Sequence, residues 1–122
     1  MSTLRNSVRL SGHVGKDPDI KYLPTGAVVA NFSLATQDDF KDRNGTWTKR
    51  TNWHNITCWG ELAKRVETHV HKGSNISIDG KLFTESWTDN DNQKRQKVYI
   101  QMSEFLTHNG PRKQDDNDLS QM

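Results

Sequence analysis

Two tryptophans of one segment have the same parity. In a strand both rings would therefore lie on one face, where they could stack on a planar ligand. In residues 51–59 (TNWHNITCW), Trp53 and Trp59 occupy odd positions among polar residues, whereas Ile56 and Cys58 occupy even ones. A half-buried strand hides every second side chain, so Ile56 and Cys58 are predicted core residues, Cys58 as a small apolar group rather than a reactive thiol. Large rings on the opposite, polar face suit stacking. Tryptophan is usually largely buried, so the alternative is that the rings cover a core edge.

Further rings lie among basic residues, and residues 38–48 favour a hairpin because of their Asn-Gly tip. The aromatic residues expected outside the core or in loops are Phe40, Trp47, Trp53, Trp59, Phe83, Trp87 and Tyr99. The basic residues interleaved with them are Arg5, Arg9, Lys41, Arg43, Lys49, Arg50, Arg95 and Lys97. Stacking rings in a positive groove predict binding of single-stranded nucleic acid, with the cations neutralising phosphates. Taken singly, each cation is better explained as a solvated surface charge than as a phosphate contact. For Trp47 the alternative is a ring folded back onto the domain.

Other chemistry finds little support. The histidines lack a partnering nucleophile at a recognisable spacing, and there is no glycine-rich phosphate loop. His69 and His71 flank a predicted helix end, which is too few ligands for zinc. The acidic residues in 38–39 and 89–91 are expected to form turns. The sequence therefore predicts no enzymatic activity, no metal and no cofactor.

Composition indicates one small domain. The 122 residues are 31% hydrophobic with a mean hydropathy of −0.94, which suits a closed barrel better than a thick layered fold. No apolar run has membrane-spanning length, the N-terminus lacks the apolar core of a secretory signal, and one cysteine excludes an internal disulfide framework. These features predict a cytoplasmic-type compartment. The net charge is +2, or +3 without residues 110–122, which is mildly basic.

Alternating hydrophobicity predicts five strands, over residues 8–16, 27–37, 51–59, 75–87 and 94–105. Residues 20–23 form a short piece between turn signals that is not counted as a strand. Leu62, Val66 and Val70 predict a helix over 61–71 that plugs one end of a barrel. Val98 is expected to point inward with its neighbours on the last strand.

This order predicts an all-β protein with one helix, specifically a five-stranded OB-fold Greek-key barrel whose helix lies between strands 3 and 4. That fold binds oligonucleotides or oligosaccharides on one face and through its rim loops. Gly12 and Gly15 suit close backbone approach at a barrel corner. Residues 1–107 are expected to form the domain, and residues 108–122 a short disordered polar and acidic tail.

Several short motifs occur in order between about residues 8 and 105. They are GHVGKDP (12–18), VANFSLAT (29–36), WHN (53–55), WGELA (59–63), KGS (72–74), IDGKL (78–82) and WTD (87–89). Together they resemble the bacterial-type single-stranded DNA-binding proteins. The resemblance implies an OB-fold that assembles as a homotetramer, with a dimer as the alternative, and that wraps single-stranded DNA in replication, recombination and repair.

The resemblance also implies roles for particular residues. The family's main stacking positions fall on Phe40, Trp53, Trp59 and Trp87, and its interface histidine falls on His54. This sequence departs from the family at residues 83–86 (FTES), where basic residues are frequent, and in its short tail. Because the tail lacks the family's terminal proline and aromatic residue, recruitment of replication or repair proteins is doubtful.

The prediction is a non-enzymatic protein that binds and protects single-stranded DNA largely without sequence preference. The alternative is an OB-fold accessory or adaptor module, of a primosome-like kind, that acts mainly through protein contacts. An enzyme or enzyme subunit ranks last, because no residues supply its chemistry. Stacking alone does not distinguish DNA from RNA.

Overall fold

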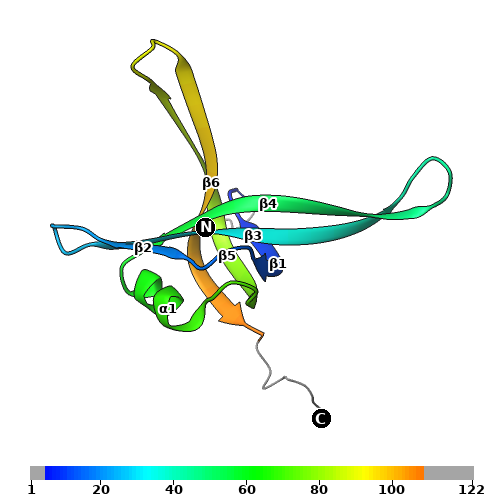
Figure 1. Ribbon diagram of the computed structural model, residues 1–122, viewed down its shortest axis with the longest axis horizontal. Helices are drawn as coiled ribbons and strands as arrows, with labels where there is room; N and C mark the ends of the chain where they lie inside the picture. The colour runs from blue at the N-terminus through cyan, green and yellow to red at the C-terminus, as the bar shows by residue number, and fades with distance from the viewer. Residues whose placement is uncertain (1–4, 109–122) are drawn as a thin grey trace.

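The computed structural model describes residues 5–108, which form a strand-rich domain with one helix (Figure 1). Its elements are β1 (Val8–Val14), β2 (Asp19–Tyr22), β3 (Val28–Lys41), β4 (Trp47–Trp59), α1 (Glu61–His69), β5 (Asn75–Thr88) and β6 (Lys94–Thr107). The short segment at residues 20–23, which was not predicted as a strand, thus largely coincides with β2, which is held by its antiparallel pairing with β3. The predicted tail lies outside the described residues except for His108.

The sheet closes into a barrel. Its strands pair in the order β1-β5-β6-β4-β3-β2, and an additional β1–β3 pairing joins the ends, so that five strands form a ring and β2 extends β3. This arrangement with a parallel β4–β6 contact is that of a Greek-key OB-type barrel. At the closure a Cβ on Gly12 would lie 2.0 Å from the Ala35 carbonyl oxygen. Only glycine fits there, as expected at a barrel corner.

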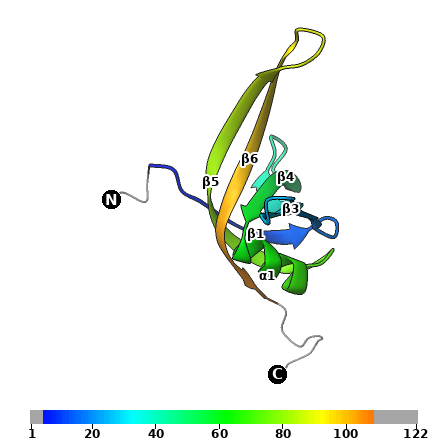
Figure 2. The ribbon, with the colours of Figure 1, turned by 90° about the vertical axis from the view of Figure 1, so that its left-hand side faces the viewer.

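The helix covers one end of the barrel core (Figures 1 and 2). Ala63, Val66 and Val70 are buried in the same cluster as the barrel's inward side chains, and Leu62 packs against it. α1 ends two residues earlier than predicted, because Val70 turns to an extended conformation (φ −113°, ψ 128°). α1 lies between β4 and β5, the strands predicted as the third and fourth. Once β2 is counted, α1 follows the fourth strand.

The alternation predicted for residues 51–59 is present in β4. Ile56 and Cys58 are 1% and 0% exposed, whereas Trp53 and Trp59 are 62% and 49% exposed. Burial raises the pKa of the Cys58 thiol to about 11, so the thiol is protonated at neutral pH and serves as a small core group.

Two long ribbons leave the barrel as arms (Figures 1 and 2). The β3–β4 ladder continues to the Lys41–Trp47 pair, so the hairpin predicted for residues 38–48 is present. Both strands extend further into it than the predicted strand bounds at residues 37 and 51. The β5–β6 ladder continues to the Thr88–Lys94 pair. Val98, predicted to point inward, is 49% exposed, because the ribbon has left the barrel there, while Ile100 remains buried. No helix within residues 5–108 is long and apolar enough to cross a membrane.

Candidate nucleic-acid interface

A polar row crosses the outer surface of the barrel between the two exposed tryptophans of β4. The strand registers place Asp19 opposite Asn31, Asn31 opposite Thr57, and Thr57 opposite Gln101. Directly paired residues point to the same face of a sheet, so these four side chains from β2, β3, β4 and β6 lie side by side. The Thr57 hydroxyl donates a hydrogen bond to the Asn31 side-chain oxygen (2.7 Å).

This row is hollowed into a pocket of about 320 Å³. The residues that line it are Asp19, Asn31, Phe32, Asn55, Ile56, Thr57 and Lys97. Trp53 lies two positions before Asn55 and Trp59 two positions after Thr57, on the same face of β4. We call this surface, from Trp53 through the hollow to Trp59, the outer face. It combines flat rings with amide and hydroxyl groups, an arrangement that suits bases stacked on the rings with their polar edges over the hollow.

The Trp53 ring packs against Gly15. A Cβ added to Gly15 would lie 2.6 Å from Cζ3 and 3.0 Å from Cη2 of Trp53. The indole thus packs directly over the Gly15 backbone, while 62% of Trp53 remains exposed. The contact with Gly15 restricts the ring before any ligand binds, which lowers the entropic cost of stacking. The opposite side of the ring remains exposed for a base.

The β5–β6 arm continues the outer face. Because Gln101 shares a face with Thr57, alternate residues Tyr99 and Lys97 on β6 belong to the same side. Their partners across the ribbon are Phe83 and Glu85. Trp87, two residues beyond Glu85, shares that side and is 48% exposed. The structure therefore places Trp53, Trp59 and Trp87 on one continuous surface.

The β3–β4 arm separates two of the predicted rings. Trp47 is 69% exposed and has the same strand parity as Trp53, so the alternative that it folds back onto the domain is wrong. Phe40 pairs with Thr48 and therefore points to the opposite face of this ribbon. There the Arg50 guanidinium lies 4.6 Å from the centre of the Phe40 ring. The sequence grouped Phe40 with the tryptophans on one side; along the ribbon it lies on the other.

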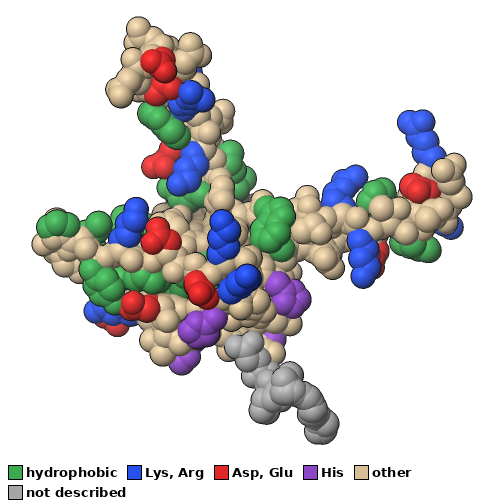
Figure 3. All heavy atoms as spheres, viewed as in Figure 1, with side chains coloured by type: hydrophobic (Ala, Val, Ile, Leu, Met, Phe, Trp, Pro, Cys, Tyr) green, Lys and Arg blue, Asp and Glu red, His purple; other side chains and the backbone are tan. Residues whose placement is uncertain are grey.

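The predicted cations divide between several surroundings, and Lys or Arg side chains lie along both arms (Figure 3). Lys97 borders the hollow. Lys41 is paired with Trp47, and Lys49 lies on the Trp47 side, while Arg43 is exposed in the turn at the arm's tip. Lys97 is thus adjacent to the outer face, whereas Lys41, Arg43 and Lys49 lie on the β3–β4 arm.

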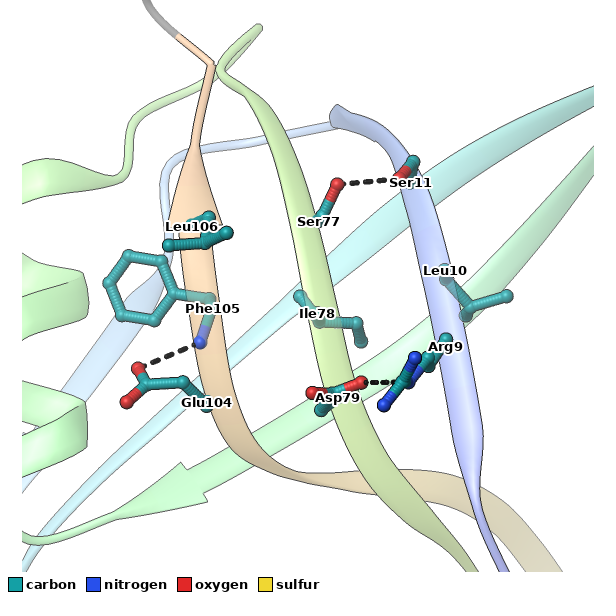
Figure 4. A pocket seen from close by; sticks show the side chains of 9 residues that line it. All are labelled: Arg9, Leu10, Ser11, Ser77, Ile78, Asp79, Glu104, Phe105 and Leu106. Atoms are coloured by element: carbon teal, nitrogen blue, oxygen red, sulfur yellow. Dashed lines mark hydrogen bonds and ion pairs between the residues drawn. The ribbon is translucent and has the colours of Figure 1, made fainter. Parts of the chain in front are cut away.

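Arg95 is the cross-strand partner of Trp87, so it lies on the side of the β5–β6 arm that continues the outer face, where it donates to the Asp89 carboxylate (2.7 Å). Arg9 and Arg5 have other surroundings. Arg9 pairs with Asp79 (2.9 Å) on the wall formed by β1, β5 and β6, beside a second pocket of about 530 Å³ (Figure 4). None of the exposed tryptophans lines that pocket. Arg5 is exposed in the segment before β1. The structure thus does not bring all predicted basic residues together.

Two cations beside the outer face, Lys21 and Lys81, were missed from the sequence. Lys81 is paired with Gln101, which shares a face with Thr57. Lys21 is paired with Val29, which is paired with Trp59, so Lys21 lies in the same cross-strand row as this ring. It was missed because residues 20–23 were not recognised as a strand. The signal available in the sequence was the alternation of Ile20 with its charged neighbours.

His54 lies on the other side of β4 from the tryptophans. Its Nε2 atom is 2.9 Å from the Thr36 hydroxyl oxygen, and its side chain is half-buried. Within residues 5–108 no three His, Cys, Asp or Glu side chains are grouped as metal ligands.

The strand order defines an OB-type barrel, a fold that binds oligonucleotides or oligosaccharides on one face and through its rim loops. The model of the single-strand binding protein family matches residues 5–107, and the chain belongs to this family. This confirms the resemblance seen in the ordered motifs.

Known relatives agree with this membership. The chain is 45% identical over 85 residues to single-stranded DNA-binding protein 1 of Chlorobaculum tepidum, a match that covers 70% of this chain and 52% of the relative. It therefore spans about half the length of that curated relative. A Plasmodium falciparum SSB solved in complex with ssDNA is 33% identical, with a TM-score of 0.79 over 85% of this chain and 95% of that one. A deletion mutant of the Thermus aquaticus single-stranded DNA-binding protein is 26% identical, with a TM-score of 0.77 over 87% and 51%.

Proposed function

We propose that this protein binds single-stranded DNA largely without sequence preference and protects it during replication, recombination and repair. The observation that carries the proposal is the outer face, on which Trp53 and Trp59 flank a polar hollow and Trp87 continues the surface along an arm. A base stacks on a ring whatever its identity, and the polar side chains between the rings hydrogen-bond to base edges. The role is one of binding and needs no catalytic group.

The cations around the face supply the electrostatic part of binding. Lys97, Lys41, Lys49, Arg43 and the newly recognised Lys21 neutralise backbone phosphates as the strand follows the barrel and the β3–β4 arm. Arg50 and Phe40 extend the path to the opposite side of that arm. Arg5, Arg9 and Arg95 are assigned smaller contributions, since two of them are already paired with carboxylates.

Two further parts of the proposal concern organisation. Residues 1–107 form the DNA-binding domain. The functional unit is a homotetramer in which His54, on the side of β4 away from the tryptophans, contacts a neighbouring subunit. What supports both is family membership and the separation of His54 from the outer face.

Titration with oligo-dT tests the proposed function. Tryptophan fluorescence should be quenched as bases stack on the exposed rings, and log Kobs should fall linearly with log salt concentration, because phosphate neutralisation releases counterions. No quenching at low salt would overturn the proposal. Competition with oligo-U measures the preference for DNA over RNA. Feeble oligo-dT binding together with nuclease-resistant protein contacts would instead indicate an adaptor module.

A further inference from the structure

The aromatic pair at the base of the β5–β6 arm lies on the outer-face side of the ribbon. Phe83 and Tyr99 are direct cross-strand partners, and their ring centres are 5.8 Å apart with planes inclined by 24°. Phe83 is 37% exposed and Tyr99 is half-buried. Neither belongs to the barrel core cluster, so burial in the core does not account for the two rings.

The opposite face of the ribbon already supplies the apolar contact with the barrel. There Leu82 is paired with Ile100, and Ile100 is only 4% exposed. Phe83 points the other way, toward the side that carries Trp87 and the hollow. A cross-strand aromatic pair stabilises a ribbon, but that role does not require a surface shared with the exposed tryptophans.

A cation completes the arrangement. The Lys97 ammonium lies 5.7 Å from the centre of the Tyr99 ring and also borders the hollow beside Asn55. The pair is therefore positioned between the barrel wall and Trp87. Trp87 is four positions beyond Phe83 on an extended strand, a rise of about 13 Å. A base stacked on one ring therefore leaves the other free.

We propose that Phe83 and Tyr99 form a further base-stacking subsite, with Lys97 contacting the phosphate of the nucleotide stacked there. The subsite rests on the proposed function and extends it, because it carries the strand from the barrel wall to Trp87. Residues 83–86 contain no basic residue, and between Lys81 and Trp87 the outer-face side of β5 carries no cation. There the aromatic pair supplies by stacking the contact that a cation would supply by charge.

Affinities of the full-length chain for labelled oligo-dT, measured by fluorescence anisotropy, test this subsite. Phe83→Ala and Tyr99→Ala should each weaken binding roughly 5- to 100-fold, the range for one lost stacked base. The double variant should lose less than the product of the two, because the rings act as one platform. Leu82→Ala is the matched control: its side chain is 48% exposed on the opposite face of the same ribbon, and its affinity should be unchanged.

Two conservative variants separate stacking from ribbon stability. Phe83→Leu retains apolar bulk across the strands but loses the flat ring, so it should bind as weakly as Phe83→Ala with an unchanged melting temperature. Phe83→Trp should bind normally and add quenching on DNA binding, which a merely structural role would not produce.

The outcomes are distinguishable. If the unaltered chain binds tightly and Phe83→Leu or Phe83→Ala binds within twofold of Leu82→Ala, the subsite is wrong and the proposed function stands. If the unaltered chain does not bind oligo-dT, the proposed function falls and the subsite falls with it.

Discussion

At the scale of single residues, the position of Trp53 depends on the absence of a side chain at Gly15. The indole occupies the space where a Cβ would be, 2.6 Å from Cζ3. A distance below about 3 Å cannot be kept, and the other close group is the Ser33 hydroxyl on β3 (3.0 Å). An exposed ring moves more readily than two strands of a closed barrel, so a larger residue at Gly15 should displace Trp53.

We therefore expect Gly15→Ala to weaken oligo-dT binding with little effect on folding. Trp53→Ala should reduce the free energy of binding by about 1–3 kcal/mol, the contribution of one stacked base. Gly15→Ala should approach this loss, and adding it to Trp53→Ala should change affinity little, because the two substitutions remove the same contact. Oligo-dT titrations of the two single variants and the double variant give the coupling.

Two controls accompany this cycle. Trp53→Phe keeps a flat ring and should retain most of the affinity. The free energy of unfolding of Trp53→Ala should stay close to that of the unaltered chain, since 62% of the residue is exposed. Additive losses from Gly15→Ala and Trp53→Ala would show that Gly15 does not position the ring.

At the scale of elements, both arms end in turns of the same construction. The Asp42 carboxylate accepts hydrogen bonds from the amides of Asn44 and Thr46. Asp89 likewise accepts from the amides two and four residues later, Asp91 and Gln93. The residue at the third position after each aspartate has a positive φ, 80° in Gly45 and 61° in Asn92. One side-chain oxygen thus organises each arm tip.

The Asp89 turn carries an additional contact and should depend on pH. The hydrogen bond from Arg95, and then that from the Gln93 amide, hold the pKa of the Asp89 carboxyl below its usual range. A carboxyl whose pKa is lower in the folded state contributes stability above its unfolded pKa and loses it as pH falls through its folded pKa. The tip should therefore stay ordered to acid pH and then loosen.

An NMR pH titration of the Asp91 and Gln93 amide signals follows this transition. Its midpoint should lie below that of an ordinary aspartate, and Arg95→Gln should raise it, because the largest cause of the shift is removed. Asp91→Asn is the control, since its backbone amide remains as a donor. An unchanged midpoint in Arg95→Gln would contradict the assignment of the shift to this contact.

The elements also show what could be predicted from the sequence. The two faces of β4 were predicted correctly, with Ile56 and Cys58 on one and Trp53 and Trp59 on the other, because alternation within one strand is a local property. The hairpin over residues 38–48 was predicted from its Asn-Gly tip, but the flanking strands were predicted to stop at residue 37 and resume at residue 51. In the structure Asp38 pairs with Arg50 and Asp39 with Lys49. Opposite charges facing one another stabilise a ribbon that has no core beneath it, and such pairing is not visible before the register is known.

Register also explains where the structure places residues differently from the sequence expectation. Phe40 was grouped with the tryptophans by residue type, but its parity in the β3–β4 ladder places it on the other face. Lys21 was missed because β2 is only four residues long, and the single alternation of Ile20 with its charged neighbours is too brief to be recognised as a strand. Val98 has the parity of a core residue, and only the point at which β6 leaves the barrel determines that it is exposed.

At the scale of the whole molecule, the two proposed roles of β4, DNA stacking and subunit contact, fall on opposite sides of the strand. Odd positions of β4 carry Trp53 and Trp59, while even positions continue from buried Ile56 to His54. A subunit contact through His54 therefore leaves the tryptophans free. This separation allows an assembly in which each chain presents its own outer face.

Light scattering on the full chain tests the proposed assembly. The expected mass at micromolar concentration is about four times the 14.0 kDa of one chain. His54→Asp should shift the population to smaller species, because a carboxylate in a half-buried contact must give up hydration without a matching partner. His69→Asp, at an exposed position near the end of α1, is the matched control and should leave the mass unchanged. A monomer at micromolar concentration would remove the interface role of His54, while the outer face, which lies within one chain, would still be expected to bind oligo-dT.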